Sequence, residues 1–310
     1  MSYDRQKLVV VLMSTYNGEK YIEKQIESIL HQKWVMVKLI IRDDGSMDST
    51  VDIINRRYSS DARVTLLSDI NVGCEKSFSW LIYNAPKADY YAFADQDDVW
   101  LDDKLYNAVK KLETESQEQP LTYYSNLKVV DENLSFLFYK FKPGYVKNTK
   151  KQALGDICVW GCTCVFNSFA LEKARLLLNQ DSSICHEHSV WLVSLFLGKT
   201  VYDENSFILY RQHGDNLSGQ VKTKGERLLY FIHRLFETRD MSPCFQPIAR
   251  ALLETFREQL DKEDRDMLER ISRYTDNKKY KLWLLFTTKI NSYDILREIS
   301  RRIRIINNKY

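Results

Sequence analysis

The chain has 310 residues, of which 44% are hydrophobic and 28% charged, as is typical of a folded globular protein. Its formal net charge of +3 is too small to favour nucleic acid as a partner, and its apolar runs are too short to span a bilayer. The first residues lack the shape of a secretion signal, so we expect a cytoplasmic protein whose six cysteines stay reduced.

Apolar runs and helical periodicities alternate through the first hundred residues. Residues 7–17 predict a strand buried on both faces, and apolar residues at helical spacing follow up to residue 32. The same succession recurs over 37–58 and over 63–85, and a fourth strand is expected from residue 89. Such repeated units favour an α/β fold, with a mostly parallel central sheet and helices on both faces.

The pattern changes after Pro120. We expect a strand and turn over 121–134, an irregular surface segment over 134–153 and a short strand over 159–167. A helix over 189–198 should end at Gly198, and residues 199–216 return to strand. Amphipathic helices, without strands, are expected from residue 224 to the end. We therefore predict a boundary near Val221, between an α/β domain at 1–221 and a helical region at 222–310.

Asp95, Asp97 and Asp98 crowd together where the fourth expected strand ends. Ligands of open α/β sheets gather beyond the carboxyl ends of the strands. Two carboxylates one residue apart can face one cation, which cancels their repulsion, and oxygen ligands suit Mg²⁺ or Mn²⁺. A solvated acidic turn, or a cap for the following helix, is the open alternative.

Four segments together resemble the family 2 inverting glycosyltransferases, and most closely the rhamnosyltransferase-like members that build bacterial surface polysaccharides. They are 9–32, 40–50, 90–105 and 210–219, and the resemblance covers roughly residues 7–220. It implies a GT-A fold, with nucleotide-sugar binding in the first half of the α/β domain and acceptor binding in the second half. A C-terminal helical extension follows.

The resemblance assigns a metal and diphosphate site. Asp95, Gln96 and Asp97 match the acidic triplet that binds Mn²⁺ or Mg²⁺ beside the nucleotide, with Asp97 as the more direct ligand. His213 matches a histidine near the metal, and Arg211 adds positive charge near the diphosphate. The ion would neutralise charge on the departing nucleoside diphosphate.

The resemblance also assigns a nucleotide site at the ends of the first two strands. Asp44 matches the acid that accepts the ring N–H of a pyrimidine, an edge that uracil and thymine share, and Lys76 can reach a phosphate. An ordinary turn residue and a solvated lysine are the alternatives for these two. The strand end that receives the base and ribose consists of Ser14, Thr15, Tyr16 and Asn17, with an ordinary core residue as the alternative for Tyr16.

The expected catalytic base is missing from its usual place. Aligned on Trp191, His188 matches a family histidine, whereas Ser189 replaces the aspartate that should take the proton of the acceptor hydroxyl. A serine cannot do this unaided at neutral pH. Glu187 is the first candidate to replace it. His188 or His186 is the second, and an enzyme impaired in catalysis is the third interpretation.

The arginine-rich C-terminal segment also carries bulky apolar residues. A basic amphipathic helix can lie on an anionic membrane, and the resemblance implies a saccharide or lipid-linked acceptor at the cytoplasmic face. A helical cap on the α/β domain and a homodimer contact are the alternatives. For the whole chain, the competing functions are a nucleotidyltransferase that makes sugar nucleotides and a nucleotide-sugar-binding member without activity. The donor would be a UDP- or dTDP-sugar, with rhamnose suggested by the resemblance alone.

Overall fold

The computed structural model describes residues 6–214 and 245–310, which divide into two compact units. Unit 1 comprises Met1–Gly144 and Val159–Gln212, and unit 2 comprises Tyr145–Cys158 and His213–Tyr310. This division differs from the predicted one, because a segment from the middle of the chain joins the C-terminal helices. The predicted boundary at Val221 lies outside the described residues.

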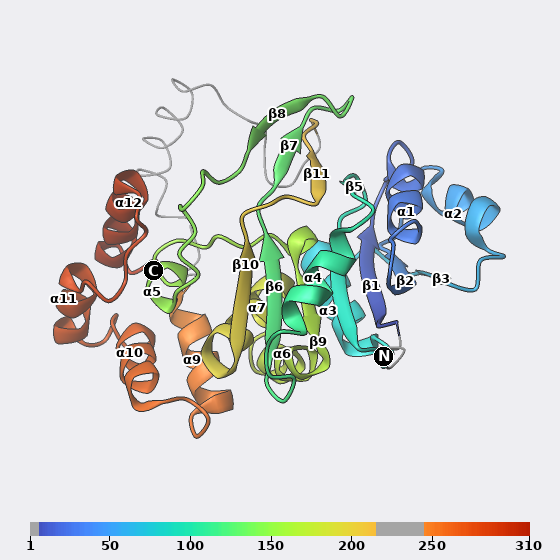
Figure 1. Cartoon of the computed structure of the whole chain (residues 1–310). Helices are drawn as coiled ribbons and strands as arrows, with labels where there is room; N and C mark the ends of the chain where they lie inside the picture. The colour runs from blue at the N-terminus through green and yellow to red at the C-terminus, as the bar shows by residue number, and fades with distance from the viewer. Residues whose placement is uncertain (1–5, 215–244) are drawn as a thin grey trace. The chain divides into compact units, whose positions relative to one another are not determined.

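Unit 1 is built on a seven-stranded sheet in the order β10-β6-β9-β4-β1-β2-β3 (Figure 1). Parallel pairing joins all neighbours except β9, which is antiparallel to both β4 and β6. The prediction of a mostly parallel sheet is therefore confirmed. The strands are β1 (Leu8–Thr15), β2 (Met36–Asp43), β3 (Val64–Ser68), β4 (Tyr90–Ala94), β6 (Leu121–Ser125), β9 (Val165–Asn167) and β10 (Lys199–Asp203).

A second, four-stranded sheet in unit 1 was not predicted. Its order is β5-β11-β7-β8, formed by Val99–Trp100, Ile208–Arg211, Lys128–Val130 and Phe136–Tyr139. The expectation of an irregular segment over 134–153 is wrong in part, because this range contains β8 and the short helix α5 (Lys150–Ala153). Strand β8 escaped prediction because its residues are largely exposed, so they carry no alternation of buried and exposed positions.

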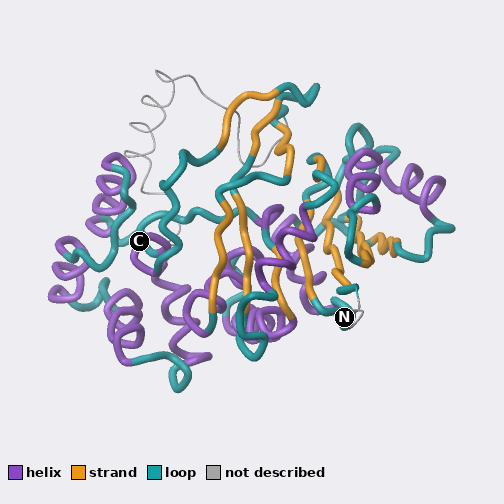
Figure 2. The backbone as a smooth tube through the Cα atoms, viewed as in Figure 1, coloured by secondary structure: helices purple, strands orange, loops and turns teal. Residues whose placement is uncertain are grey.

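Helices cover both faces of the central sheet, as predicted (Figure 2). Helices α3, α6 and α7 contact one another on one face, while α1 and α4 share a hydrophobic core with the other face. Helix α7 ends at Gly198, as expected. The helices of unit 1 are α1 (Ile22–Leu30), α2 (Thr50–Tyr58), α3 (Cys74–Asn84), α4 (Lys104–Leu112), α6 (Ser168–Gln180) and α7 (His186–Leu197).

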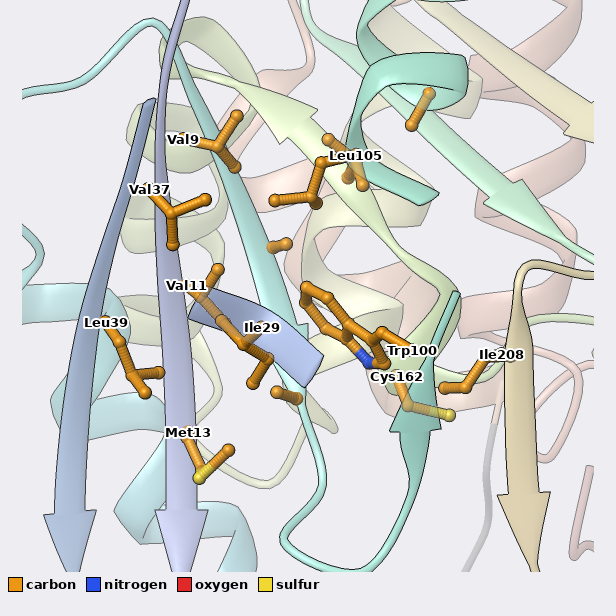
Figure 3. Close-up of a cluster of buried hydrophobic side chains, with 14 of the residues drawn as sticks. Val9, Val11, Met13, Ile29, Val37, Leu39, Trp100, Leu105, Cys162 and Ile208 are labelled. Atoms are coloured by element: carbon orange, nitrogen blue, oxygen red, sulfur yellow. The ribbon is translucent and has the colours of Figure 1, made fainter. Parts of the chain in front are cut away.

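The core beneath α1 and α4 follows from the two-residue period of the strands. Val9, Val11 and Met13 of β1 point to the same face and pack with Leu39 of β2, as Figure 3 shows. Helix α1 supplies isoleucines at helical spacing to this cluster. The alternate β1 positions are also fully buried, on the opposite face. This double burial fixes the sheet and therefore the place where its strands end.

Unit 2 consists of α5 and the C-terminal helices α9 (Phe245–Phe256), α10 (Lys262–Ser272), α11 (Lys278–Phe286) and α12 (Ile295–Ile306). The C-terminal Tyr310 is buried in this unit, where its hydroxyl donates to the carbonyl of Leu154 at 2.6 Å. Arg297 of α12 pairs with Asp156. Among the described residues, every helix is too short or too polar to cross a bilayer.

Candidate functional site

The carboxyl ends of β1 and β4 are locked together by Gln96. Its Oε1 accepts the backbone N–H of Tyr16 at 2.8 Å and the hydroxyl of Thr15 at 2.6 Å, while its Nε2 donates to the Tyr16 carbonyl at 3.0 Å. A side chain at Gly18 would collide with Gln96, which explains the glycine. The middle residue of the acidic triplet therefore shapes the loop predicted to receive the nucleotide.

The predicted pyrimidine acceptor, Asp44, lies buried at the end of β2. Its two carboxylate oxygens accept the backbone N–H groups of Val72 at 2.9 Å and Gly73 at 2.8 Å, and Arg42 donates to it from the strand. Gly73 has a φ of 87°, and α3 begins directly after it. Asp44 thus fixes the loop that starts α3, and its contact with a base stays a prediction.

The three aspartates after β4 have different surroundings. Asp98 is fully buried, and its Oδ1 accepts the backbone N–H of Arg211 at 3.0 Å. Its Oδ2 has no hydrogen-bond partner among the residues that the structure describes. Burial, reinforced by the charges of Asp97 and Asp95, raises the pKa of Asp98 well above its usual value. Burial and then Asp97 raise the pKa of Asp95 to about 7.

These surroundings fit a divalent cation at residues 95–98, which we call the acidic turn. One ligand atom from each of Asp95, Asp98 and Cys162 lies within 4.8 Å of the others. A thiol is a poor ligand for Mg²⁺ or Mn²⁺, and Asp98 is sealed inside the fold. The partly exposed carboxylates of Asp95 and Asp97 are thus the pair suited to such an ion, which would relieve their mutual repulsion.

Arg211 supports the acidic turn from behind. Its Nε donates to the carbonyl of Asp97 at 2.7 Å, and its Nη1 donates to the carbonyl of Glu132 at 2.6 Å. The guanidinium also lies 4.6 Å from the centre of the Tyr21 ring. Because Arg211 is only 4% exposed, these contacts identify a structural role, and its contact with a diphosphate stays a prediction.

The remaining predicted residues are more dispersed. Lys76 is exposed in the first turn of α3, where its contact with a phosphate stays a prediction. The hydroxyl of Ser14 donates to that of Ser77, also on α3, at 2.6 Å. Asn17 has a φ of 49° and ties its loop to the end of β2. His213 belongs to unit 2, and its proximity to the metal stays a prediction.

The start of α7 separates the candidates for the catalytic base. Ser189 is fully buried, and its hydroxyl donates to the carbonyl of His186 at 2.6 Å, so it faces away from solvent. Burial lowers the pKa of His188. Glu187 keeps about a fifth of its side chain exposed, and its charge contributes to the raised pKa of Asp95. Of these three side chains, only that of Glu187 carries a carboxylate, the group that the missing aspartate would supply.

Sequence reasoning missed Glu75 and gave His186 only as an alternative base. The structure places Nδ1 of the His186 ring close to both Glu75 of α3 and Glu187 of α7. Glu75 precedes His186 by 111 positions, and no local motif connects them. The signal lies only in the topology, because the contact joins the start of α3 to the start of α7, which follows another helix, α6, in the chain.

Comparison with known proteins agrees with this geometry. Residues 10–175 match the family model described as "Glycosyl transferase family 2". The dTDP-rhamnosyl transferase RfbG of Shigella flexneri is 30% identical over 237 residues, which are 70% of this chain and 78% of that protein. The putative teichuronic acid biosynthesis glycosyltransferase TuaG of Bacillus subtilis is 28% identical, over 74% of this chain and 88% of TuaG.

A solved structure shows the same fold. The crystal structure of S. aureus TarS 1-349 in complex with UDP aligns with a TM-score of 0.53 and 15% sequence identity, over 90% of this chain and 75% of that one. The predicted GT-A fold is therefore confirmed. The family match, which covers more than half of the chain, places the protein in a family of sugar-transfer enzymes rather than among enzymes of nucleotide-sugar synthesis. The chain belongs to glycosyl transferase family 2.

Proposed function

We propose that the chain is an inverting, metal-dependent glycosyltransferase of bacterial cell-surface polysaccharide synthesis. It would move a sugar from a UDP- or dTDP-sugar to a saccharide or lipid-linked acceptor, with rhamnose as the first candidate. The carrying observation is that the acidic turn after β4 and the start of α7 share one site, since the His186 ring of α7 meets Phe93 of β4, two residues before Asp95, at 4.8 Å. The names of the relatives RfbG and TuaG support the sugar and the pathway class.

The ends of β1 and β2 support a pyrimidine nucleotide as the donor's carrier. Tyr16 is 41% exposed on the rigid loop held by Gln96, which suits stacking on a base. The Asp44 carboxylate accepts three hydrogen bonds in the fold, and because a carboxylate has about four acceptor positions, one remains for a ring N–H. TarS, with the same fold, was crystallised with UDP.

In the proposed reaction, Glu187 takes the proton of the acceptor hydroxyl while the hydroxyl oxygen attacks the anomeric carbon. The bond from that carbon to the diphosphate oxygen breaks in the same step, so the configuration inverts and the nucleoside diphosphate leaves with the bonding electron pair. Asp95 and Asp97 would hold Mn²⁺ or Mg²⁺, which stabilises the negative charge on the diphosphate. We propose that positive charge from Arg211, His213 or Lys76 adds to this stabilisation of the diphosphate.

The experiment is release of dTDP from dTDP-rhamnose, and of UDP from UDP-sugars, with and without Mn²⁺. Asp97→Ala should abolish Mn²⁺-dependent donor binding in calorimetry, whereas Asp102→Asn, at an exposed aspartate of the next loop, should not. Glu187→Gln should leave donor binding intact and lower turnover about 10²–10⁴-fold, the usual contribution of a general base. Unchanged donor affinity in Asp97→Ala, or wild-type turnover in Glu187→Gln, would remove the corresponding role.

A nucleotide-sugar-binding member without transfer activity is the second candidate, favoured by Ser189 at the place expected for the base. The same assay separates the two. Donor binding without release of nucleoside diphosphate in the wild-type protein would favour the inactive member, and Mn²⁺-dependent release that Glu187→Gln abolishes would exclude it.

We also propose that α11 and α12 touch the inner face of the plasma membrane. Helix α12 buries Arg301, which is 3% exposed and donates to the Leu284 carbonyl, while Ile295 and Ile306 are 78% and 57% exposed. At about 100° per residue, Ile295, Ile299 and Ile306 fall within about 40° on one side of the helix. A surface helix of a soluble protein buries its apolar side and exposes its charged side. Helix α12 does the reverse, with isoleucines exposed and an arginine buried.

The residues around this exposed face suit an anionic lipid surface. Phe286 of α11 is 73% exposed, and Arg302 lies on the outer side of α12, with Lys289 nearby in the chain. Apolar side chains that enter the interface beside cations that pair with lipid headgroups are typical of interfacial helices.

Vesicle sedimentation tests this contact. The protein should bind vesicles containing phosphatidylglycerol, bind phosphatidylcholine vesicles weakly, and lose affinity when Ile295, Ile299 and Ile306 are all changed to Ser. Changing the exposed Met47 of unit 1 to Ser is the control. Equal binding by the triple variant would contradict the proposed surface.

A further inference from the structure

Two carboxylates lie close to one nitrogen of an imidazole where α3 and α7 begin. His186 Nδ1 lies 3.4 Å from Oε2 of Glu75 and 3.3 Å from Oε2 of Glu187. The two glutamates approach from different helices, α3 and α7. The ring nitrogen is therefore in a position to attract both carboxylates at once.

The His186 ring is held almost immobile. It stacks on Phe78, with ring centres 3.9 Å apart and planes 11° apart, and it meets the edge of Phe93 at 4.8 Å. At Gly161 a side chain would begin 2.7 Å from Nε2, so only glycine leaves room for the ring. With 6% of its surface exposed, His186 cannot turn its Nδ1 edge away from the glutamates.

The charges favour an imidazolium between the glutamates. Burial lowers the pKa of His186, but the charge of Glu187 and the hydrogen bond and charge of Glu75 more than offset this, so the net pKa is raised. The hydrogen bond from His186 lowers the pKa of Glu75 in turn. Asp95 is the further carboxylate that acts on the ring, and His188 is the neighbouring titratable group on α7.

Glu75 also holds the backbone at the start of α7. Its Oε2 lies 3.4 Å from the backbone N–H of His186, and Cys185, the residue before the helix, makes no capping hydrogen bond with its side chain. Glu75 thus replaces the missing cap from another helix. A change at Glu75 should therefore reach Glu187 through both the ring and the first turn of α7.

We propose that Glu75 and His186 are positioning residues, which together orient Glu187 toward the acceptor hydroxyl. This inference rests on the proposed function of Glu187 as the base. A glutamate has a longer and more mobile side chain than the aspartate it would replace, so it needs a fixed charged neighbour to hold its carboxylate in one direction. The Glu75–His186 pair supplies that neighbour and reaches Glu187 without touching substrate.

The test measures dTDP release from dTDP-rhamnose, together with donor affinity by calorimetry and thermal stability. Glu75→Leu should lower kcat about 10–100-fold, the range found when a partner of a metal ligand is removed, with unchanged donor affinity and a melting temperature lowered by only a few degrees, as expected for a lost helix cap. Glu75→Gln keeps an oxygen that accepts from the ring and the backbone, so it should recover part of the loss. Glu118→Gln, at an exposed glutamate, should behave as wild type.

A double-mutant cycle separates failure of this inference from failure of the proposed base. If Glu187 is the base and Glu75 acts through it, Glu75→Leu should cost nothing further in the Glu187→Gln background. Wild-type kcat in Glu75→Leu with an inactive Glu187→Gln would overturn the positioning role alone, whereas an active Glu187→Gln would overturn the base. Weaker Mn²⁺ binding in both Glu75→Leu and His186→Asn would instead identify Glu75, His186 and Glu187 as a cation site. This result would also overturn the inference.

Discussion

Replacing Lys104 with methionine should stabilise the protein at neutral pH. Lys104 is 1% exposed, and its Nζ has no hydrogen-bond partner among the described residues. It lies 3.7 Å from the centre of the Trp100 ring. Burial lowers the pKa of Lys104 to about 8, against a smaller opposing effect of Cys162, Cys164 and Asp98. A charged lysine is therefore held in an apolar place at a cost.

The size of that cost follows from the pKa. A fall from 10.5 to about 8 corresponds to about 3 kcal/mol at about 1.4 kcal/mol per pKa unit. Attraction of the charged Nζ to the Trp100 ring can offset about 2 kcal/mol of this cost at a desolvated site. Methionine has a similar length and no charge, so Lys104→Met should raise the free energy of unfolding by about 1–3 kcal/mol at pH 7.

The pH dependence has a definite sign. Below about pH 8 the lysine is protonated in both the folded and unfolded states, so its full cost is present. Between pH 8 and 10.5 the folded protein loses the proton first, the unfolded state binds more protons, and the stability of the native protein rises with pH. The advantage of Lys104→Met should therefore shrink over this range and vanish above it.

Urea unfolding followed by circular dichroism at pH 7 and at pH 10 measures the difference. Lys110→Met, at an exposed lysine of the same helix, is the matched control and should stay within about 0.5 kcal/mol of wild type. If Lys104→Met instead destabilises the protein by about 3 kcal/mol at pH 7, the lysine is a true partner of ionised Asp98. The reasoning from desolvation would then be refuted.

Three further substitutions test contacts that support the candidate site and the fold around it. Gly18→Ala should displace Gln96 and weaken donor affinity about tenfold in calorimetry while the protein stays folded. Asp98→Asn should keep the protein within about 1 kcal/mol of wild-type stability in urea unfolding, because an asparagine oxygen can still accept the backbone N–H of Arg211. Gly198→Ala should lose about 3 kcal/mol in the same assay, since a side chain there collides with the backbone of Pro120, which cannot move aside; an unchanged midpoint would contradict the described contact.

The central sheet could be predicted because its signals are local. The run from Val9 to Met13 is apolar at every position, which is typical of a strand covered on both faces, and the structure buries all of these residues. The second sheet gave no such signal. Strand β5 has two residues, and β8 leaves Phe136 and Tyr139 exposed, so pairing with β7 rather than burial defines it.

The candidate site, like the fold, could be predicted only where its signals are local. Asp95 and Asp97 could be singled out because they follow an apolar strand within one short segment, although the buried state of Asp98 could not be foreseen from spacing. The contact of Glu75 with His186 joins residues 111 positions apart. Only the strand order, which sets β4 beside β1 and brings α3 and α7 together, creates it.

The same topology explains how so many carboxylates can gather at one place. The starts of α3 and α7 both lie beside the acidic turn, and the positive end of a helix dipole stabilises anions. The charge of His186 favours the ionised form of Asp95 and opposes the rise of its pKa, and the buried Arg211 donates a hydrogen bond to the backbone of the turn. These groups offset only part of the effects of burial and of the charge of Asp97, which raise the pKa of Asp95 to about 7. A divalent cation held by Asp95 and Asp97 would neutralise their charge, and without it these carboxylates would repel a nucleoside diphosphate.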